Sequence, residues 1–122
     1  MKVKIIFDDG YVIEAQLFDT PCAKAIYEIL PIDSIVNRWG DEFYFTIPLY
    51  YPLDETATVD VNVGDIGYWP PGRALAIFFG PTPMSSDEKP VPYSEVNLVG
   101  KILCSPKILK ELSPFKVKVE RG

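Results

Sequence analysis

The stretch Ala74-Leu-Ala-Ile-Phe-Phe79 is apolar at six consecutive positions. Successive side chains of a β-strand point to opposite faces of the sheet, so a strand built from these residues is apolar on both faces. A strand of this kind is typical of the centre of a sheet that is covered on both sides. We therefore expect a central strand over residues 74–79, whose small alanines face another part of the chain that approaches closely.

Segments with alternating apolar residues lie on both sides of this strand in the sequence. Residues 2–7 and 11–17 alternate around Asp9-Gly10, a dipeptide that is typical of the turn in a β-hairpin. The same reasoning predicts further strands over residues 34–38, 43–47, 58–63, 96–103 and 115–119.

Two short helices are expected between these strands. Thr20 before Pro21 is a helix start signal, and apolar residues then recur at helical spacing until Pro31 ends the pattern, which predicts a helix over residues 21–30. A Ser-Pro start predicts a second one over residues 105–112. Many short strands, two helices and no alternation of strands with helices indicate a mainly β fold. We expect one domain over residues 1–122, a closed antiparallel barrel of about eight strands with two short capping helices.

Composition limits the class of protein. With 48% hydrophobic and 24% charged residues, the chain of 122 residues falls in the range of globular domains. It has no stretch of about 20 apolar residues and no apolar signal-peptide region, so we expect a soluble, cytoplasmic protein without a membrane partner. Twelve prolines beside three asparagines and one glutamine favour a thermophilic source.

The absence of histidine excludes much of hydrolytic and metal chemistry. Without His, the chain cannot form a Ser-His-Asp unit or a His-ligated metal site. Cys22 and Cys104 lie far apart in the sequence, which indicates neither a zinc site nor a redox pair; two buried thiols are expected, and a disulfide stays open. No glycine-rich phosphate loop occurs. We therefore expect no metal and no cofactor.

Charge is unevenly distributed. Residues 101–122 carry a net charge of +4, and the remaining residues carry −9, which sums to the −5 of the chain. An acidic body repels phosphate backbones, so no nucleic-acid partner is expected. The sequence does not determine the oligomeric state.

Two segments, 38–45 and 64–73, concentrate side chains suited to recognition. The interior of a small barrel is filled by its own side chains, so a ligand binds at a mouth or in a side groove formed by strand ends and loops. Each ring in these segments could alternatively be a core residue. The candidate ligand-binding residues are Trp39, Phe43, Tyr44, Tyr68 and Trp69 from these segments, together with Phe79 at the end of the expected central strand.

Three charged residues are candidates for catalysis. Glu42 lies close to Trp39 in the sequence, and a carboxyl against an indole ring can have a raised pKa and act as a general acid or base. Arg38 and Arg73 each offer a fork of donors for a carbonyl or carboxylate. The alternatives are a turn role for Glu42 and a structural ion pair for each arginine.

Four blocks of sequence together resemble one known family. They are Arg38-Trp-Gly-Asp-Glu-Phe-Tyr-Phe45, Gly64-Asp-Ile-Gly-Tyr-Trp-Pro-Pro-Gly72, Phe78-Phe-Gly-Pro-Thr-Pro83 and Asn97-Leu-Val-Gly100. In this order they are similar to the atypical cyclophilin-like family of small single-domain bacterial and archaeal proteins. The resemblance implies an eight-stranded antiparallel barrel with two helices, which agrees with the strand and helix count above.

The resemblance implies peptidyl-prolyl isomerase activity less directly. The chain lacks the Phe-His-Arg and Phe-Met-x-Gln-Gly-Gly-Asp runs with which true cyclophilins supply their catalytic arginine and proline pocket. We therefore expect an aromatic groove that binds a small molecule or a proline-containing peptide, with isomerase activity weak or absent.

Two enzymatic alternatives remain. Prolyl isomerisation needs an apolar seat for the proline ring and a donor, and no titrating group. A genuine isomerase would use Arg38 or Arg73 as that donor. The other alternative is an enzyme acting on small amides or lactams with Glu42 as its acid or base. The seat of the isomerase alternative would be formed by Trp39, Phe43, Trp69 and Phe79.

Overall fold

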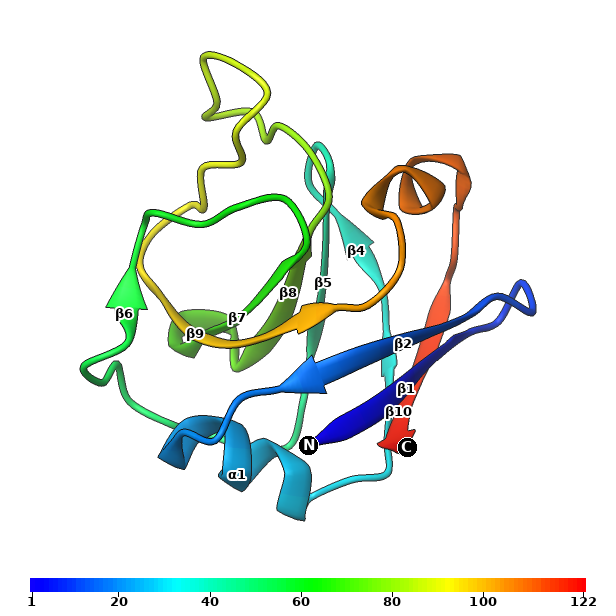
Figure 1. The fold of residues 1–122 in the computed structure, drawn as a ribbon, viewed down its shortest axis with the longest axis vertical. Coiled ribbons are helices and arrows are strands. Elements are labelled where there is room, and N and C mark those ends of the chain that lie inside the picture. Colours follow the sequence, from blue (N-terminus) through cyan, green and yellow to red (C-terminus); the bar gives the residue numbers. More distant parts are fainter.

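The computed structural model describes residues 1–122 and shows one antiparallel sheet that curls into a nearly closed barrel (Figure 1). The strands follow the order β3-β10-β1-β2-β9-β7-β8-β5-β4, and β6 pairs with β9 beside this path. Two of the ten strands, β4 and β6, have only two residues each, so the prediction of about eight strands is confirmed. The strands are β1 (Lys2–Phe7), β2 (Val12–Leu17), β3 (Ile32–Ile35), β4 (Asn37–Arg38), β5 (Glu42–Thr46), β6 (Ala57–Thr58), β7 (Asp65–Trp69), β8 (Ala74–Phe78), β9 (Val96–Ile102) and β10 (Lys116–Arg121).

The opening hairpin forms as the alternation predicts. Its turn is made by Gly10, whose φ of 91° favours glycine, and by Asp9, whose carboxylate accepts the amide of Tyr11 at 3.1 Å. Alternate residues of β1 and β2 are buried in the barrel. Because β10 pairs along the other edge of β1, β1 lies between β2 and β10 in the sheet.

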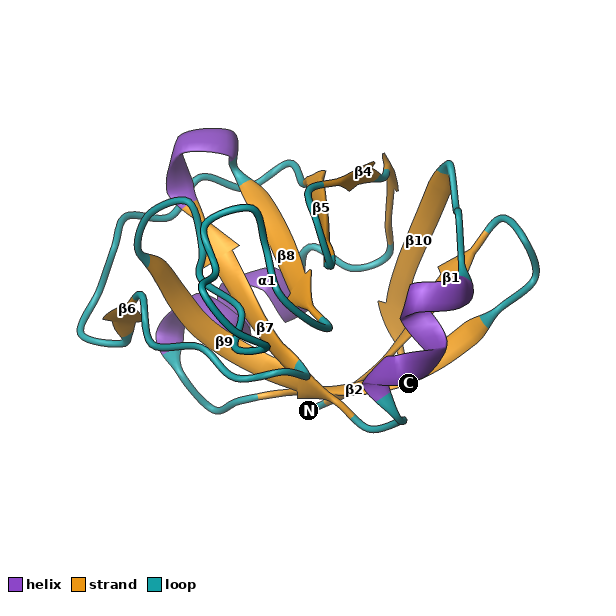
Figure 2. Ribbon diagram, turned by 90° about the horizontal axis from the view of Figure 1, so that it is seen from above, coloured by secondary structure: helices purple, strands orange, loops and turns teal.

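One continuous segment brings the two ends of the sheet together. Residues 32–38 pair with β10 through β3 and then with β5 through β4, with Val36 between the two strands. The hydroxyl of Ser34 donates to the carbonyl of Thr46 at 2.6 Å across the junction. Figure 2 shows the consequence: β7, β8 and β9 lie on one side of the barrel, and β1 and β10 lie on the other.

The central position predicted for residues 74–79 is confirmed, since β8 lies between β5 and β7. Leu75 and Ile77 point into the barrel, where they join the core cluster of 26 buried residues. Ala76 and Phe78 point outward and belong to a second buried cluster with Val61 and Val96. The sheet of β5, β8, β7 and β9 therefore has an apolar inner face, inside the barrel, and an apolar outer face, which loops cover.

The strand predicted over residues 58–63 is wrong beyond Thr58. Only Ala57–Thr58 pairs with β9, and the following residues form a loop in which Val59 and Val63 are exposed. Thr58 already pairs with Val96, the first residue of β9, so the residues that follow it have no strand beside them. The opposite edge of β9 pairs with β7, a strand that the sequence pattern does not predict. Two glycines in and beside β7, Gly64 and Gly67, reduce its β-propensity, so the sequence pattern does not indicate a strand there.

Two helices lie near the ends of the barrel (Figure 1). Helix α1 (Pro21–Glu28) begins at Thr20, whose hydroxyl accepts the amide of Ala23 at 3.3 Å, and it is two residues shorter than predicted. The second helix is a 3₁₀ helix, η2 (Pro106–Glu111), which adds Leu109 to the core. A third, η1 (Pro70–Gly72), is a single turn. No helix has the length and apolar character needed to cross a membrane.

Candidate functional site

A cavity of about 260 Å³ lies on the outer face of the sheet, beneath the covering loops. The strands β5, β7, β8 and β9 supply its floor, and loop residues supply its walls. Seven of its nine lining residues are hydrophobic. They are Trp39, Glu42, Tyr44, Trp69, Ala76, Phe78, Pro92, Tyr93 and Val96.

Three aromatic rings form a row along this cavity. The ring of Tyr93 lies between two indoles, with its centroid 5.9 Å from that of Trp39 and 6.0 Å from that of Trp69, both in edge-to-face geometry. The indole nitrogen of Trp69 donates to the hydroxyl of Ser94 at 2.7 Å, which fixes that ring. Trp39 and Trp69 are partly exposed and Tyr93 is 68% exposed. The row therefore borders the cavity and stays open to solvent.

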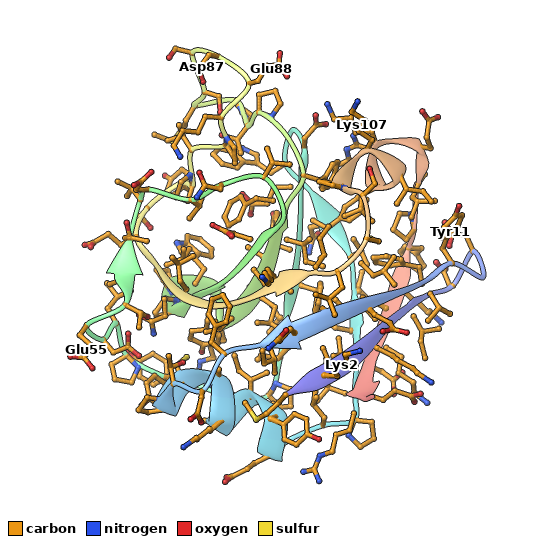
Figure 3. The ribbon with its side chains drawn as sticks, viewed as in Figure 1. Lys2, Tyr11, Glu55, Asp87, Glu88 and Lys107 are labelled. Atoms are coloured by element: carbon orange, nitrogen blue, oxygen red, sulfur yellow. The ribbon has the colours of Figure 1, made fainter.

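The loop of residues 80–95, which carries Tyr93, is tied to the neighbouring loop of residues 59–64. The ammonium group of Lys89 binds Asp60 and Asn62, each at 2.9 Å. Figure 3 shows Asp87 and Glu88 at the outer tip of this loop. The two loops thus cover the outer face together, and their acidic tip points into solvent.

The tight turn between β4 and β5 positions Trp39 and Glu42. Trp39 donates its amide to the carbonyl of Glu42 at 2.9 Å. Gly40 has a φ of 61°, and a Cβ at this position would lie 2.8 Å from Cδ of Pro83. The amide of Asp41 donates to the carbonyl of Pro81 at 2.9 Å. Because the turn packs against residues 79–83 so closely, the indole and the carboxyl at its two ends are held at fixed positions.

Glu42 is the one acidic side chain that lines the cavity. Only 7% of it is exposed, it forms no ion pair, and its Oε1 is buried without a hydrogen-bond partner. Burial disfavours the charged carboxylate and raises the pKa of Glu42 to about 7. At neutral pH this carboxyl can therefore either give up or accept a proton, the property predicted for it from its place beside an indole.

No basic side chain lines the cavity. The guanidinium of Arg38 donates to the carbonyls of Gly40 at 2.9 Å and Leu112 at 3.3 Å, and it pairs with Asp41 at 3.0 Å. Its carbon lies 5.2 Å from the centroid of the Phe79 ring. All of these contacts are structural, as in the alternative considered for this arginine.

Arg73 also lies away from the cavity. It follows η1 in the left-handed conformation, with a φ of 47°, and its guanidinium lies 5.5 Å from the centroid of the exposed Tyr50 ring. Neither of the arginines considered as isomerase donors faces the aromatic row.

A family comparison agrees with this fold. The family model described as Cyclophilin-like matches residues 1–120. The chain belongs to this family. The solution structure of a hypothetical protein from Archaeoglobus fulgidus is similar to this cyclophilin-like chain, with a TM-score of 0.82 and 40% sequence identity over 100% of this chain and 95% of that one. None of the curated proteins matches.

The candidate residues of this cyclophilin-like protein separate into two groups. Trp39, Glu42, Tyr44 and Trp69 line the cavity together. Phe43, Tyr68 and Phe79 lie on the inner face, where each is at most 1% exposed, so the structure assigns them to the core and not to the cavity. The physical reason is alternation along the strands, since Phe43 is next to both Glu42 and Tyr44 and must point the other way.

Each inner-face residue has a packing role. The rings of Phe43 and Phe79 have centroids 4.6 Å apart. The hydroxyl of Tyr68 accepts the amide of Tyr51 at 3.1 Å and donates to the carbonyl of Leu49, which holds residues 49–51 against the barrel. Removing these side chains would therefore affect stability first.

Five lining residues were not among the candidates. Pro92 and Tyr93 come from a loop whose Pro90-Val-Pro-Tyr-Ser94 sequence combines proline with an aromatic residue, as Tyr68-Trp-Pro-Pro71 does in the segment of residues 64–73. That composition was the available signal. The others, Ala76, Phe78 and Val96, are ordinary strand residues, and only the fold shows that they face a cavity.

The thiols and acidic residues form no metal site in the structure. No group of three or more His, Cys, Asp or Glu side chains lies close enough together to hold a metal ion.

Cys22 and Cys104 are not bonded to each other. Burial raises the pKa of Cys22 to about 11, so this thiol stays protonated and unreactive at neutral pH.

Proposed function

We propose that this cyclophilin-like protein is a binding module that accepts a small molecule, or one group of a proline-containing peptide, in the cavity that Trp39, Tyr93 and Trp69 border. The observation that carries the proposal is the cavity on the outer face, which is mostly apolar and open to solvent along its aromatic row. Its volume of about 260 Å³ is below the roughly 300–1,000 Å³ of pockets for drug-sized ligands. The occupant is therefore small, or it inserts a single group.

We further propose that prolyl isomerase activity is weak or absent. The rings of the cavity provide a seat for a proline ring, but catalysis also needs a donor aimed at the amide nitrogen to lower a barrier of about 18–20 kcal/mol. Arg38 and Arg73 do not line the cavity, and the indole N–H of Trp69 is used by Ser94. A seat with no guanidinium beside it supports binding over isomerisation.

One observation favours a second candidate, an enzyme that acts on a small amide or lactam. A general acid or base works best when its pKa is close to the working pH, and burial brings the pKa of Glu42 to about 7. The binding proposal and this candidate share the cavity and differ in whether turnover occurs. If turnover of an amide is found, Glu42→Gln should abolish it, and activity that persists in this variant would exclude Glu42 as the acid or base.

Intrinsic fluorescence tests binding directly, because the two tryptophans of the chain both line the cavity. Titration with short Ala-Pro and Leu-Pro peptides, and with a panel of small molecules, should change the emission. Trp69→Leu should lower the affinity for a ligand that binds by at least about tenfold. Tyr11→Ala is the matched control, since Tyr11 is at the tip of the opening hairpin (Figure 3). Equal affinity in Trp69→Leu and Tyr11→Ala would overturn the proposal.

A protease-coupled assay with the same peptides tests isomerisation. We expect rates close to the uncatalysed rate. Clear catalysis by the wild type that disappears in both Arg38→Ala and Arg73→Ala would contradict the binding-only function and support a genuine isomerase.

A further inference from the structure

The cavity is lined by aromatic rings and one buried carboxyl, and no basic side chain lines it. We propose that the group it binds is an alkylammonium, a nitrogen cation covered by apolar carbon, which lies against the row of Trp39, Tyr93 and Trp69 and has Glu42 as its counter-charge. This inference rests on the proposed binding function and names the chemical class of the ligand.

The charges around the cavity favour a cation over an anion. Glu42, Tyr44 and Tyr93 are the only titratable side chains on its wall, and the remaining lining residues cannot ionise. Asp41, next to Glu42 in the chain, is paired with Arg38 at 3.0 Å and Lys110 at 3.5 Å. An anion would meet a carboxyl without any compensating cation.

The aromatic row suits a cation with an apolar surface. Cations are attracted to the faces of tryptophan and tyrosine within about 6 Å of the ring centre, and cages of such rings recognise quaternary ammonium groups. Adjacent centroids in the row are 5.9 Å and 6.0 Å apart, so one small cation can reach more than one ring. The cavity volume limits the bound part of the ligand to a group of this size.

Glu42 distinguishes an alkylammonium from a neutral apolar group of the same shape. A buried carboxyl without a partner is costly, and a neutral apolar ligand would leave that cost unchanged. A cation beside it stabilises the ionised form. Binding should therefore release a proton from Glu42 wherever the free protein holds it protonated.

The experiment compares choline with the neutral alcohol in which carbon replaces its nitrogen. Dissociation constants are measured by tryptophan fluorescence and calorimetry on the full chain. At a pH of about 8 we expect choline to bind at least about tenfold more tightly than the alcohol. Glu42→Gln should remove this advantage, while Glu55→Gln, which removes an exposed carboxylate outside the cavity, should preserve it.

The pH dependence of the wild type supplies a readout that needs no variant. Burial places the pKa of Glu42 at about 7. Below this pH, choline must displace the proton, so its affinity should fall toward that of the neutral alcohol, by about tenfold in total, while the affinity of the neutral alcohol stays constant. A choline affinity that does not change with pH in this range would contradict the role given to Glu42.

A second arm separates the two sources of an alkylammonium. A short peptide with a trimethylated lysine is compared with the same peptide carrying unmodified lysine. Preference for the methylated peptide supports the proposal with a peptide as the source, and binding of choline alone supports it with a free amine as the source.

The outcomes also separate this inference from the binding function. If the neutral alcohol binds as tightly as choline or more tightly, the alkylammonium assignment is overturned and the binding module stands. If neither compound binds at millimolar concentration, and Trp69→Leu changes the affinity of no ligand in the panel, both proposals fall.

Discussion

The inner and outer faces of β5 and β8 differ in how completely they are filled. On the inner face, Phe43 and Phe79 are 1% exposed and pack against each other within the main core. On the outer face, Glu42 and Tyr44 border a cavity of about 260 Å³. Because neighbouring residues in a strand alternate between the faces, the same strand supplies a close-packed core to one side and a binding surface to the other.

Small residues explain why the outer face is left partly unfilled. Ala76 lines the cavity, and at Gly67, on the same face of β7, an added Cβ would lie 2.7 Å from a methyl group of Val96. Gly67 lets Val96 of β9 approach closely, while the small side chain of Ala76 leaves space that the proline-stiffened loop of residues 80–95 covers. The cavity therefore results from loops laid over a sheet, whereas the core results from side chains that interdigitate.

The largest expected effect contrasts two adjacent rings. Phe43→Ala removes a buried ring that contacts Phe7 and Phe79, and we expect it to lower the free energy of unfolding by about 3–5 kcal/mol. Tyr44→Ala, one residue further on, removes a ring that is partly exposed at the cavity and should cost about 1 kcal/mol or less. Urea denaturation of both variants checks this; equal losses would mean that the two faces are equally close-packed.

The next effect concerns the pH dependence of stability. Glu42 has a pKa of about 7 in the folded protein and an ordinary value near 4.5 when unfolded. Below both values the carboxyl is protonated in both states and contributes no difference. As the pH rises from about 4.5 to about 7, the unfolded chain loses its proton first, so the wild type loses stability, by up to about 3 kcal/mol in total.

Glu42→Gln removes this titration. The difference in free energy of unfolding between the variant and the wild type should therefore shift in favour of the variant by about 2–3 kcal/mol between about pH 4 and about pH 8. Denaturation at several pH values measures it. A constant difference would show that Glu42 has an ordinary pKa and that the outer face is wetter than its burial indicates.

A pair of alanines tests the packing of the two faces directly. Ala15 is fully buried in the barrel core, and Ala15→Val should destabilise the protein by about 1–3 kcal/mol through overpacking. Ala76→Val adds the same methyl groups to the cavity wall, where there is room, and should change stability by less than about 1 kcal/mol while weakening ligand binding. Thermal melts and fluorescence titrations distinguish these results; if Ala76→Val were the more harmful, the cavity would not exist in solution.

The smallest effect separates the two arginines. Arg38 donates to the buried residue Leu112 and lies over Phe79, so Arg38→Ala should cost about 1–2 kcal/mol. Arg73 contacts only the exposed ring of Tyr50 among the aromatic residues, and Arg73→Ala should stay within about 0.5 kcal/mol of the wild type. Melting temperatures provide the measurement, and a large drop for Arg73→Ala would show that it has a structural role.

Much of the fold was predictable because its signals are local. The Asp9-Gly10 turn, the start of α1 at Thr20 and the central position of residues 74–79 each depend on a few neighbouring residues, and all are confirmed. The predicted strand over 58–63 failed for the opposite reason. Its valines alternate correctly, but Thr58 already pairs with Val96, where β9 begins, so the residues after Thr58 have no strand to pair with, a long-range condition that no local pattern contains.

The residues themselves determined that β8 is apolar on both faces, and that Trp39, Glu42 and Trp69 are available for recognition. The tertiary structure alone decided which face lies inside the barrel. It thereby placed Phe43 in the core and Glu42 at the cavity, although the two are adjacent in the chain. The physical reason is that alternation states which side chains share a face, whereas inside and outside depend on the way the whole sheet closes.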